Sequence, residues 1–171
     1  MEELARLTDI EAAKIAIGVE ENGIAFYEAV RKRTRDRKTA DLLQHLVEQE
    51  KEHKELFESI EKKLLGRGER YWDDPSTTEY VRAILSPGIF PSRGPTRGAA
   101  GMAEGRGLPE SRAETLAFAL QIEKDSVLFY DVAASKASQA ETRATFRAIG
   151  DEERQHVLDI ARLMASQTTP P

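Results

Sequence analysis

Apolar residues recur at alternating three- and four-residue steps in four stretches of the chain, which is the spacing of one face of an α-helix. The first stretch spans residues 8–33, and Thr8 and Glu11 at its start have the spacing of a capping box. The second spans residues 39–65 and is followed by glycine, which commonly ends a helix. Because the link between them is short, the two stretches predict a helical hairpin over residues 8–65.

A second hairpin is predicted over residues 110–165. Its first helix starts near residue 110, where Ser111 and Glu114 form another capping-box pattern, and its second helix has Ser138 and Glu141 as its start signal. Neither hairpin can bury its apolar face alone, so each is expected to pack against another hairpin. The pattern therefore favours an all-α fold, a four-helix bundle in a single domain covering residues 1–171.

The segment of residues 66–109, which connects the hairpins, is too long for a simple turn. Residues 76–85 predict a short amphipathic helix, and residues 87–107 are rich in glycine and proline. A long crossover is needed if the second and third helices of the bundle run parallel. A long, flexible connection would also let two chains exchange hairpins. We therefore expect a homodimer, in which domain swapping is an open alternative.

Six acidic and histidine residues fall on the apolar faces of the four predicted helices. They form two sets with the same internal spacing, the second following the first at a constant offset of 103 residues: Glu20, Glu50 and His53, then Glu123, Glu153 and His156. In each Glu-x-x-His pair the two side chains share one helix face, so they can reach the same point in space. Four carboxylates and two imidazoles inside a four-helix bundle indicate a site for two metal ions.

The chemistry of these side chains favours divalent metal ions as their partners. Ionised carboxylates in an apolar core are costly unless they are paired, and two divalent ions balance four carboxylates. Oxygen and imidazole ligands favour two iron ions for redox work, with manganese and zinc as alternatives. Tyr27 and Tyr130, which also repeat, are either core aromatics or hydrogen-bond donors to ligand carboxylates. His45 has no counterpart in the repeat and is expected at the surface.

The composition of the chain argues against several classes of function. The 171 residues carry a net charge of -5 and the sequence pI is near 5.4, which argues against nucleic acid as a partner. The basic residues gathered in the segment 31–38 are interpreted as complementing a helix C-terminus. No apolar stretch is long enough for a membrane span and the acidic start lacks a secretory pattern, so a cytoplasmic protein is expected. The absence of cysteine excludes thiol chemistry and iron–sulfur centres.

The two ligand sets resemble those of the ferritin-like superfamily, and most closely the rubrerythrin-type diiron domain. The resemblance covers residues 8–65 and 110–165 and includes the position of Tyr27, while residues 79–85 resemble a short connecting helix of this group. It implies a left-handed bundle in which two glutamates bridge two irons and each iron has one further glutamate and one histidine. The bridging pair would be Glu50 and Glu153, and the remaining ligands would be Glu20, His53, Glu123 and His156.

Two features depart from this family. Rubrerythrins carry a further carboxylate one turn after the terminal glutamate of the third helix, and here that position holds Ser126, which cannot ligate in the same way. The cysteine-rich rubredoxin domain that supplies electrons in that family is also absent from the sequence. The resemblance therefore implies an external electron donor, or ferrous iron itself as the source of electrons.

The leading hypothesis is a dinuclear-metal oxidoreductase that oxidises Fe(II), or reduces hydrogen peroxide or O2, at this site. Two alternatives belong to other classes: a protein that binds or stores metal without turnover, and a structural module held together by metal. A manganese catalase is a further alternative. Retention of ferric iron after a single oxidation would favour storage, and loss of activity without any change in melting temperature on metal removal would exclude the structural module.

Overall fold

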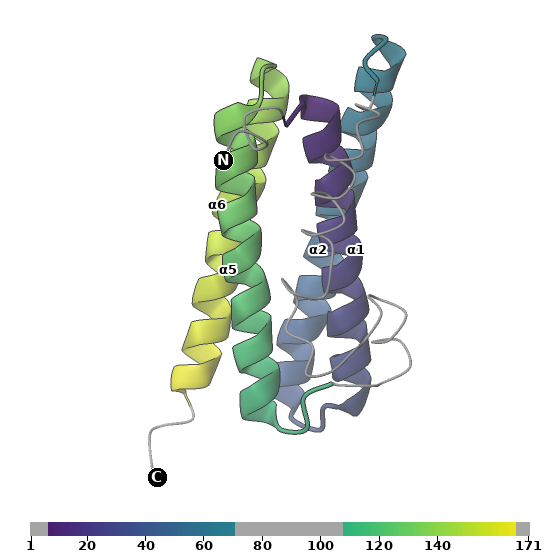
Figure 1. The fold of residues 1–171 in the computed structure, drawn as a ribbon. Helices are drawn as coiled ribbons and strands as arrows, with labels where there is room; N and C mark the ends of the chain where they lie inside the picture. The colour runs from purple at the N-terminus through teal and green to yellow at the C-terminus, as the bar shows by residue number, and fades with distance from the viewer. Residues whose placement is uncertain (1–6, 71–107, 167–171) are drawn as a thin grey trace.

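The computed structural model describes residues 7–70 and 108–166, whose regular structure is α-helical (Figure 1). No strand occurs within these two ranges, so the prediction of an all-α fold is confirmed. No helix in the described part of the chain combines the length and the apolarity that a membrane span requires. The four helices are α1 Asp9–Arg33, α2 Arg37–Gly66, α5 Arg112–Lys136 and α6 Ala140–Ala165.

The helices form two hairpins packed side by side, as predicted. α1 packs along α2, α5 packs along α6, and the hairpins meet through α1 against α5 and α2 against α6. Figure 1 shows that α5 starts at the end of the bundle where α1 turns into α2, so α2 and α5 run in the same direction.

The predicted short helix of residues 76–85 and the predicted loop of residues 87–107 lie outside the described residues. The two hairpins of one chain pack on each other in this structure. Exchange of hairpins between two chains, and the homodimer itself, stay predictions.

Two helices begin at the capping residues that the sequence predicts. The Thr8 hydroxyl accepts from the Glu11 N–H at 3.4 Å and the Glu11 carboxylate accepts from the Thr8 N–H at 3.0 Å, which completes the capping box of α1. At the start of α5, the Ser111 hydroxyl accepts from the Glu114 N–H at 3.1 Å. These bonds satisfy N–H groups that the first turn of a helix leaves without a backbone partner.

The start of α2 lies two residues before the predicted position. Asp36 is its N-cap, and the Asp36 carboxylate accepts from the Thr39 N–H at 2.9 Å. Arg112 of α5 donates to the same carboxylate at 2.9 Å and to the Thr39 hydroxyl at 2.7 Å, so the cap also joins the two hairpins at this end of the bundle. Hydrogen bonds from Thr39 and Arg112 lower the pKa of Asp36 to about 2.

The predicted cap of α6 is wrong. Its N-cap is Gln139, which makes no side-chain capping bond, and Ser138 does not cap Glu141. Instead the carboxylate of Asp9, at the start of α1, accepts from the Ser138 N–H at 2.7 Å, the Ser138 hydroxyl at 3.0 Å and the Gln139 N–H at 3.0 Å. A carboxylate at a helix N-terminus also has a favourable interaction with the helix dipole, so a residue from another helix replaces the local cap.

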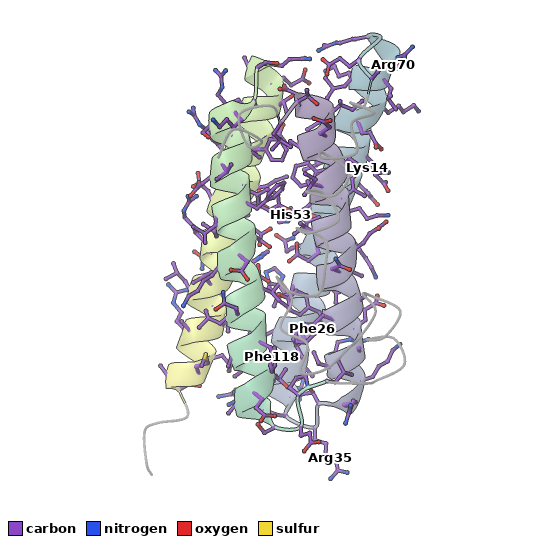
Figure 2. The ribbon with its side chains drawn as sticks, viewed as in Figure 1. Lys14, Phe26, Arg35, His53, Arg70 and Phe118 are labelled. Carbon is purple, nitrogen blue, oxygen red and sulfur yellow. The ribbon has the colours of Figure 1, made fainter. Side chains whose placement is uncertain are left out.

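The apolar core forms two clusters, and along α2, α5 and α6 the predicted metal ligands lie between residues of one cluster and residues of the other. On α2, Glu50 and His53 follow Val47 of the first cluster and precede Phe57 of the second. In the second cluster Phe57 stacks on Tyr130, with ring centroids 5.4 Å apart. Figure 2 shows His53 near the middle of the bundle, with Phe26 and Phe118 of the first cluster closer to one end. The six predicted ligands are therefore surrounded by apolar side chains of the core.

Candidate metal centre

All six predicted ligands meet in the interior of the bundle. Each of α1 and α5 contributes one glutamate, and each of α2 and α6 contributes a glutamate and a histidine one turn apart. None of the six is more than 3% exposed: Glu20, Glu50, His53, Glu123, Glu153 and His156. Buried charged groups of this density require partners, because burial without compensation costs several kcal/mol for each ion. The arrangement is therefore a polar site and not a set of surface pairs.

The side chains form two overlapping groups that could each hold a metal ion. Within each group one ligand atom from every member lies within 4.8 Å of the others. Glu50 and Glu153 belong to both groups, whereas each remaining residue belongs to one. The members are Glu20, Glu50, His53 and Glu153 in the first group, and Glu50, Glu123, Glu153 and His156 in the second. Two shared carboxylates and four unshared side chains form a donor set that could hold two adjacent cations.

Both histidines direct the same ring nitrogen, Nδ1, at the carboxylates. His53 Nδ1 lies 3.2 Å from Glu50 Oε2 and 3.1 Å from Glu153 Oε1. His156 Nδ1 lies 3.0 Å from Glu153 Oε2 and 3.4 Å from Glu123 Oε2. The two imidazoles are stacked, with centroids 5.9 Å apart. Nδ1 is therefore the ring nitrogen that each histidine places among the carboxylates.

The two repeated tyrosines cross between the hairpins. Tyr27 of α1 donates to Glu123 of α5, and Tyr130 of α5 donates to Glu20 of α1. Both rings are fully buried, and burial raises the pKa of both hydroxyls well above the ordinary value. Each tyrosine thus stays protonated as a donor and holds a glutamate of the opposite hairpin in place, which matches the hydrogen-bonding alternative stated from the sequence.

Burial and mutual repulsion control the protonation of the glutamates. Burial, followed by repulsion from a neighbouring carboxylate, raises the pKa of three of them well above 4.5: Glu20, Glu50 and Glu153. Glu123 is the exception. Burial alone would raise its pKa, but hydrogen bonds with Glu153 and His156 outweigh burial and lower it.

For the two histidines, burial acts to lower the pKa, whereas nearby carboxylates act to raise it. Burial lowers the pKa of His53, but its contact with Glu153 and the other nearby carboxylates outweighs burial and raises the pKa to about 9. The pKa of His156 is also raised, because contact with Glu123 outweighs its burial. Without metal, protons therefore compensate the negative charge of the site. A metal ion has to displace these protons in order to bind.

One carboxylate oxygen supports the fit of a cation to this site. Glu153 Oε1 is buried and has no hydrogen-bond partner among the described residues, although it lies 3.1 Å from His53 Nδ1. A buried carboxylate oxygen without such a partner is unfavourable unless a cation completes its surroundings. The oxygen and imidazole donors present suit iron, manganese or zinc.

One residue that contacts the site was not predicted from the sequence. Glu152, which is 53% exposed, has its Oε2 atom 3.0 Å from Nε2 of the buried His53. Its position directly before a Glu-x-x-His motif was the available signal. His45 is exposed, as predicted, but its ring packs edge-on against His156 with centroids 6.2 Å apart. Ser126 is buried and belongs to neither ligand group.

Comparison with known proteins gives a family match that covers most of the first hairpin. Residues 1–61 match the family model described as Rubrerythrin, a range that includes Glu20, Glu50 and His53. The resemblance to rubrerythrins is thereby confirmed over that part of the chain. Neither the curated proteins nor the solved structures compared with the chain give a significant match. The ligands of the second hairpin therefore rest on the internal repeat and on the geometry above.

Proposed function

We propose that this chain, whose first hairpin is of the rubrerythrin type, is a diiron-carboxylate oxidoreductase that oxidises Fe(II) with hydrogen peroxide or O2. The sharing of Glu50 and Glu153 by two buried ligand groups carries this proposal. Shared carboxylates hold two ions side by side, where both can act on one small oxidant. Oxidation of two Fe(II) ions supplies the two electrons that, with two protons, convert one hydrogen peroxide into two water molecules.

The six ligands have distinct roles in this proposal. Glu50 and Glu153 would bind both ions, and their charges would offset part of the metal charge in the low-dielectric interior. Glu20 and Glu123 would each bind one ion, and each is oriented by a tyrosine from the other hairpin. His53 and His156 each offer Nδ1 to one ion. The apolar clusters on both sides of the ligands exclude water and strengthen these electrostatic interactions.

Repeated turnover requires a source of electrons outside the site. An external donor, or fresh Fe(II) that replaces the oxidised ions, would return the site to its starting state. The buried position of the ligands restricts oxidants to small molecules, which supports peroxide or O2 over an organic substrate.

Oxidation kinetics test this proposal. Protein freed of metal and loaded anaerobically with two Fe(II) per chain should oxidise iron faster than buffer does when peroxide or air is admitted. The expected stoichiometry is one peroxide for two Fe(II). The matched control is the double variant His53→Ala/His156→Ala, which should return the rate to that of buffer because each ion loses its imidazole. Equal rates for the wild-type protein, the variant and buffer would contradict the proposed function.

A further inference from the structure

The internal repeat breaks at one position that contacts the metal centre. Glu152 lies 3.0 Å from His53 Nε2, the ring nitrogen that faces away from the ligand carboxylates. The equivalent position in the first hairpin is Gln49, and its side-chain amide donates to Glu52 at 3.3 Å. The imidazole of His53 therefore has a carboxylate on its outer side, whereas the equivalent residue of the first hairpin carries a neutral amide.

The surroundings of His156 differ in the same direction. Its hydrogen bonds with the described residues are all made by Nδ1. The ring of His45 packs edge-on against it, whereas the position equivalent to His45 in the second hairpin is Ala148. An additional anion thus lies beside His53, and an additional imidazole lies beside His156. The additional anion favours a cation on the side of His53.

Some contacts of the two halves are alike, but those of the histidine Nδ1 atoms differ, because His53 Nδ1 lies near the two shared glutamates and His156 Nδ1 lies near Glu153 and Glu123. Each tyrosine donates to the glutamate of the opposite hairpin, and each histidine directs Nδ1 at two glutamates. The two groups also share Glu50 and Glu153 equally.

We propose that Glu152 is a positioning residue that makes the two metal positions unequal, so that the ion beside His53 is held more tightly than the ion beside His156. A carboxylate that accepts the Nε2–H bond fixes the tautomer whose Nδ1 lone pair faces the metal, and it makes the imidazole a stronger ligand. The ion beside His156 lacks this support and exchanges more readily. This inference rests on the dinuclear site of the proposed function.

Anaerobic titration of the metal-free protein with Co(II), followed by calorimetry and visible absorption, tests the inference. Wild-type protein should bind two ions in two separate steps. Glu152→Gln, at a half-exposed position where folding is little affected, should weaken the tighter step by about 10- to 100-fold and leave the other nearly unchanged. Gln49→Glu should tighten the weaker step. The control Glu55→Gln removes the same charge from an exposed position on α2 and should change neither step.

Proton NMR of the Co(II) protein gives a readout that a structural role would not move. Paramagnetic Co(II) shifts the imidazole N–H signals away from the other proton signals. The Nε2 proton of His53 should exchange slowly with solvent because Glu152 accepts its hydrogen bond. Glu152→Ala should make that exchange fast. Two equal steps in wild-type protein, or an unchanged tighter step in Glu152→Gln, would overturn the inference while the dinuclear site stands. Binding of a single ion would overturn both.

Discussion

Glu153→Ala should weaken the binding of both metal ions, because this side chain belongs to both ligand groups. The loss should exceed the roughly 10- to 100-fold change that follows removal of a group that only supports a ligand. Glu50→Ala should behave in the same way, since Glu50 is the other shared residue. Calorimetric titration of the metal-free variants with Co(II) or Fe(II) under anaerobic conditions would measure both steps.

Glu20→Ala is the matched control for these variants. Glu20 is as buried as Glu50 and has the same chemistry, but it belongs to one ligand group only. Its removal should therefore weaken one step much more than the other. Equal losses in Glu20→Ala and Glu153→Ala would contradict the assignment of Glu50 and Glu153 as the shared ligands.

Removal of metal should lower the melting temperature most strongly at alkaline pH. A ligand present at 100 to 1,000 times its dissociation constant stabilises a protein by about 3–4 kcal/mol. For a chain of this size each kcal/mol changes the melting temperature by roughly 2–4 °C, so chelation near pH 7.5 should lower it by about 6–16 °C for each ion removed. The difference should be smaller near pH 5.5, and differential scanning calorimetry with and without chelator would measure it.

The larger effect of chelation at higher pH follows from the protonation of the metal-free site. The pKa values of Glu20, Glu50 and Glu153 are raised above 4.5, so their contribution to stability is complete below 4.5 and is lost as the pH rises through the raised values. The contribution of His53 is complete below 6.5 and is lost as the pH rises through about 9. Glu123, whose pKa is lowered, loses its contribution only below the ordinary carboxyl range.

The metal-free protein should therefore melt at progressively lower temperature as the pH rises from about 5 to 9. The metal-loaded protein should not follow this trend, because deprotonated ligands bind metal more tightly. Coincident melting curves at pH 7.5, or a larger effect of chelation at pH 5.5 than at pH 7.5, would contradict this account.

Local and repeated signals made much of the fold and the candidate site predictable. The apolar spacing of each helix fixed which side chains face the interior, and Glu20, Glu50 and His53 lie on those faces. The constant offset to the second set indicated that the two hairpins contribute alike. The cap of α1 was predictable because Thr8 and Glu11 are neighbours on one helix turn.

Features that depend on contacts between distant segments were not predictable in this way. Asp9 replaces the predicted Ser138 cap from a position 129 residues away in the chain. Glu152 is on an exposed face of α6, and its contact with His53, 99 residues away, depends on how α6 packs against α2. The sequence likewise indicated that Tyr27 could bond a ligand carboxylate, but the partner, Glu123, comes from the opposite hairpin.

The most direct measurement of the central claim is anomalous diffraction at the iron edge from crystals loaded with Fe(II) under anaerobic conditions. The account predicts two peaks in the middle of the bundle, roughly 3.5–4 Å apart as in other two-metal sites. Each peak should have one histidine ligand, and both should contact Glu50 and Glu153. A single peak, or iron bound away from these six side chains, would contradict the account.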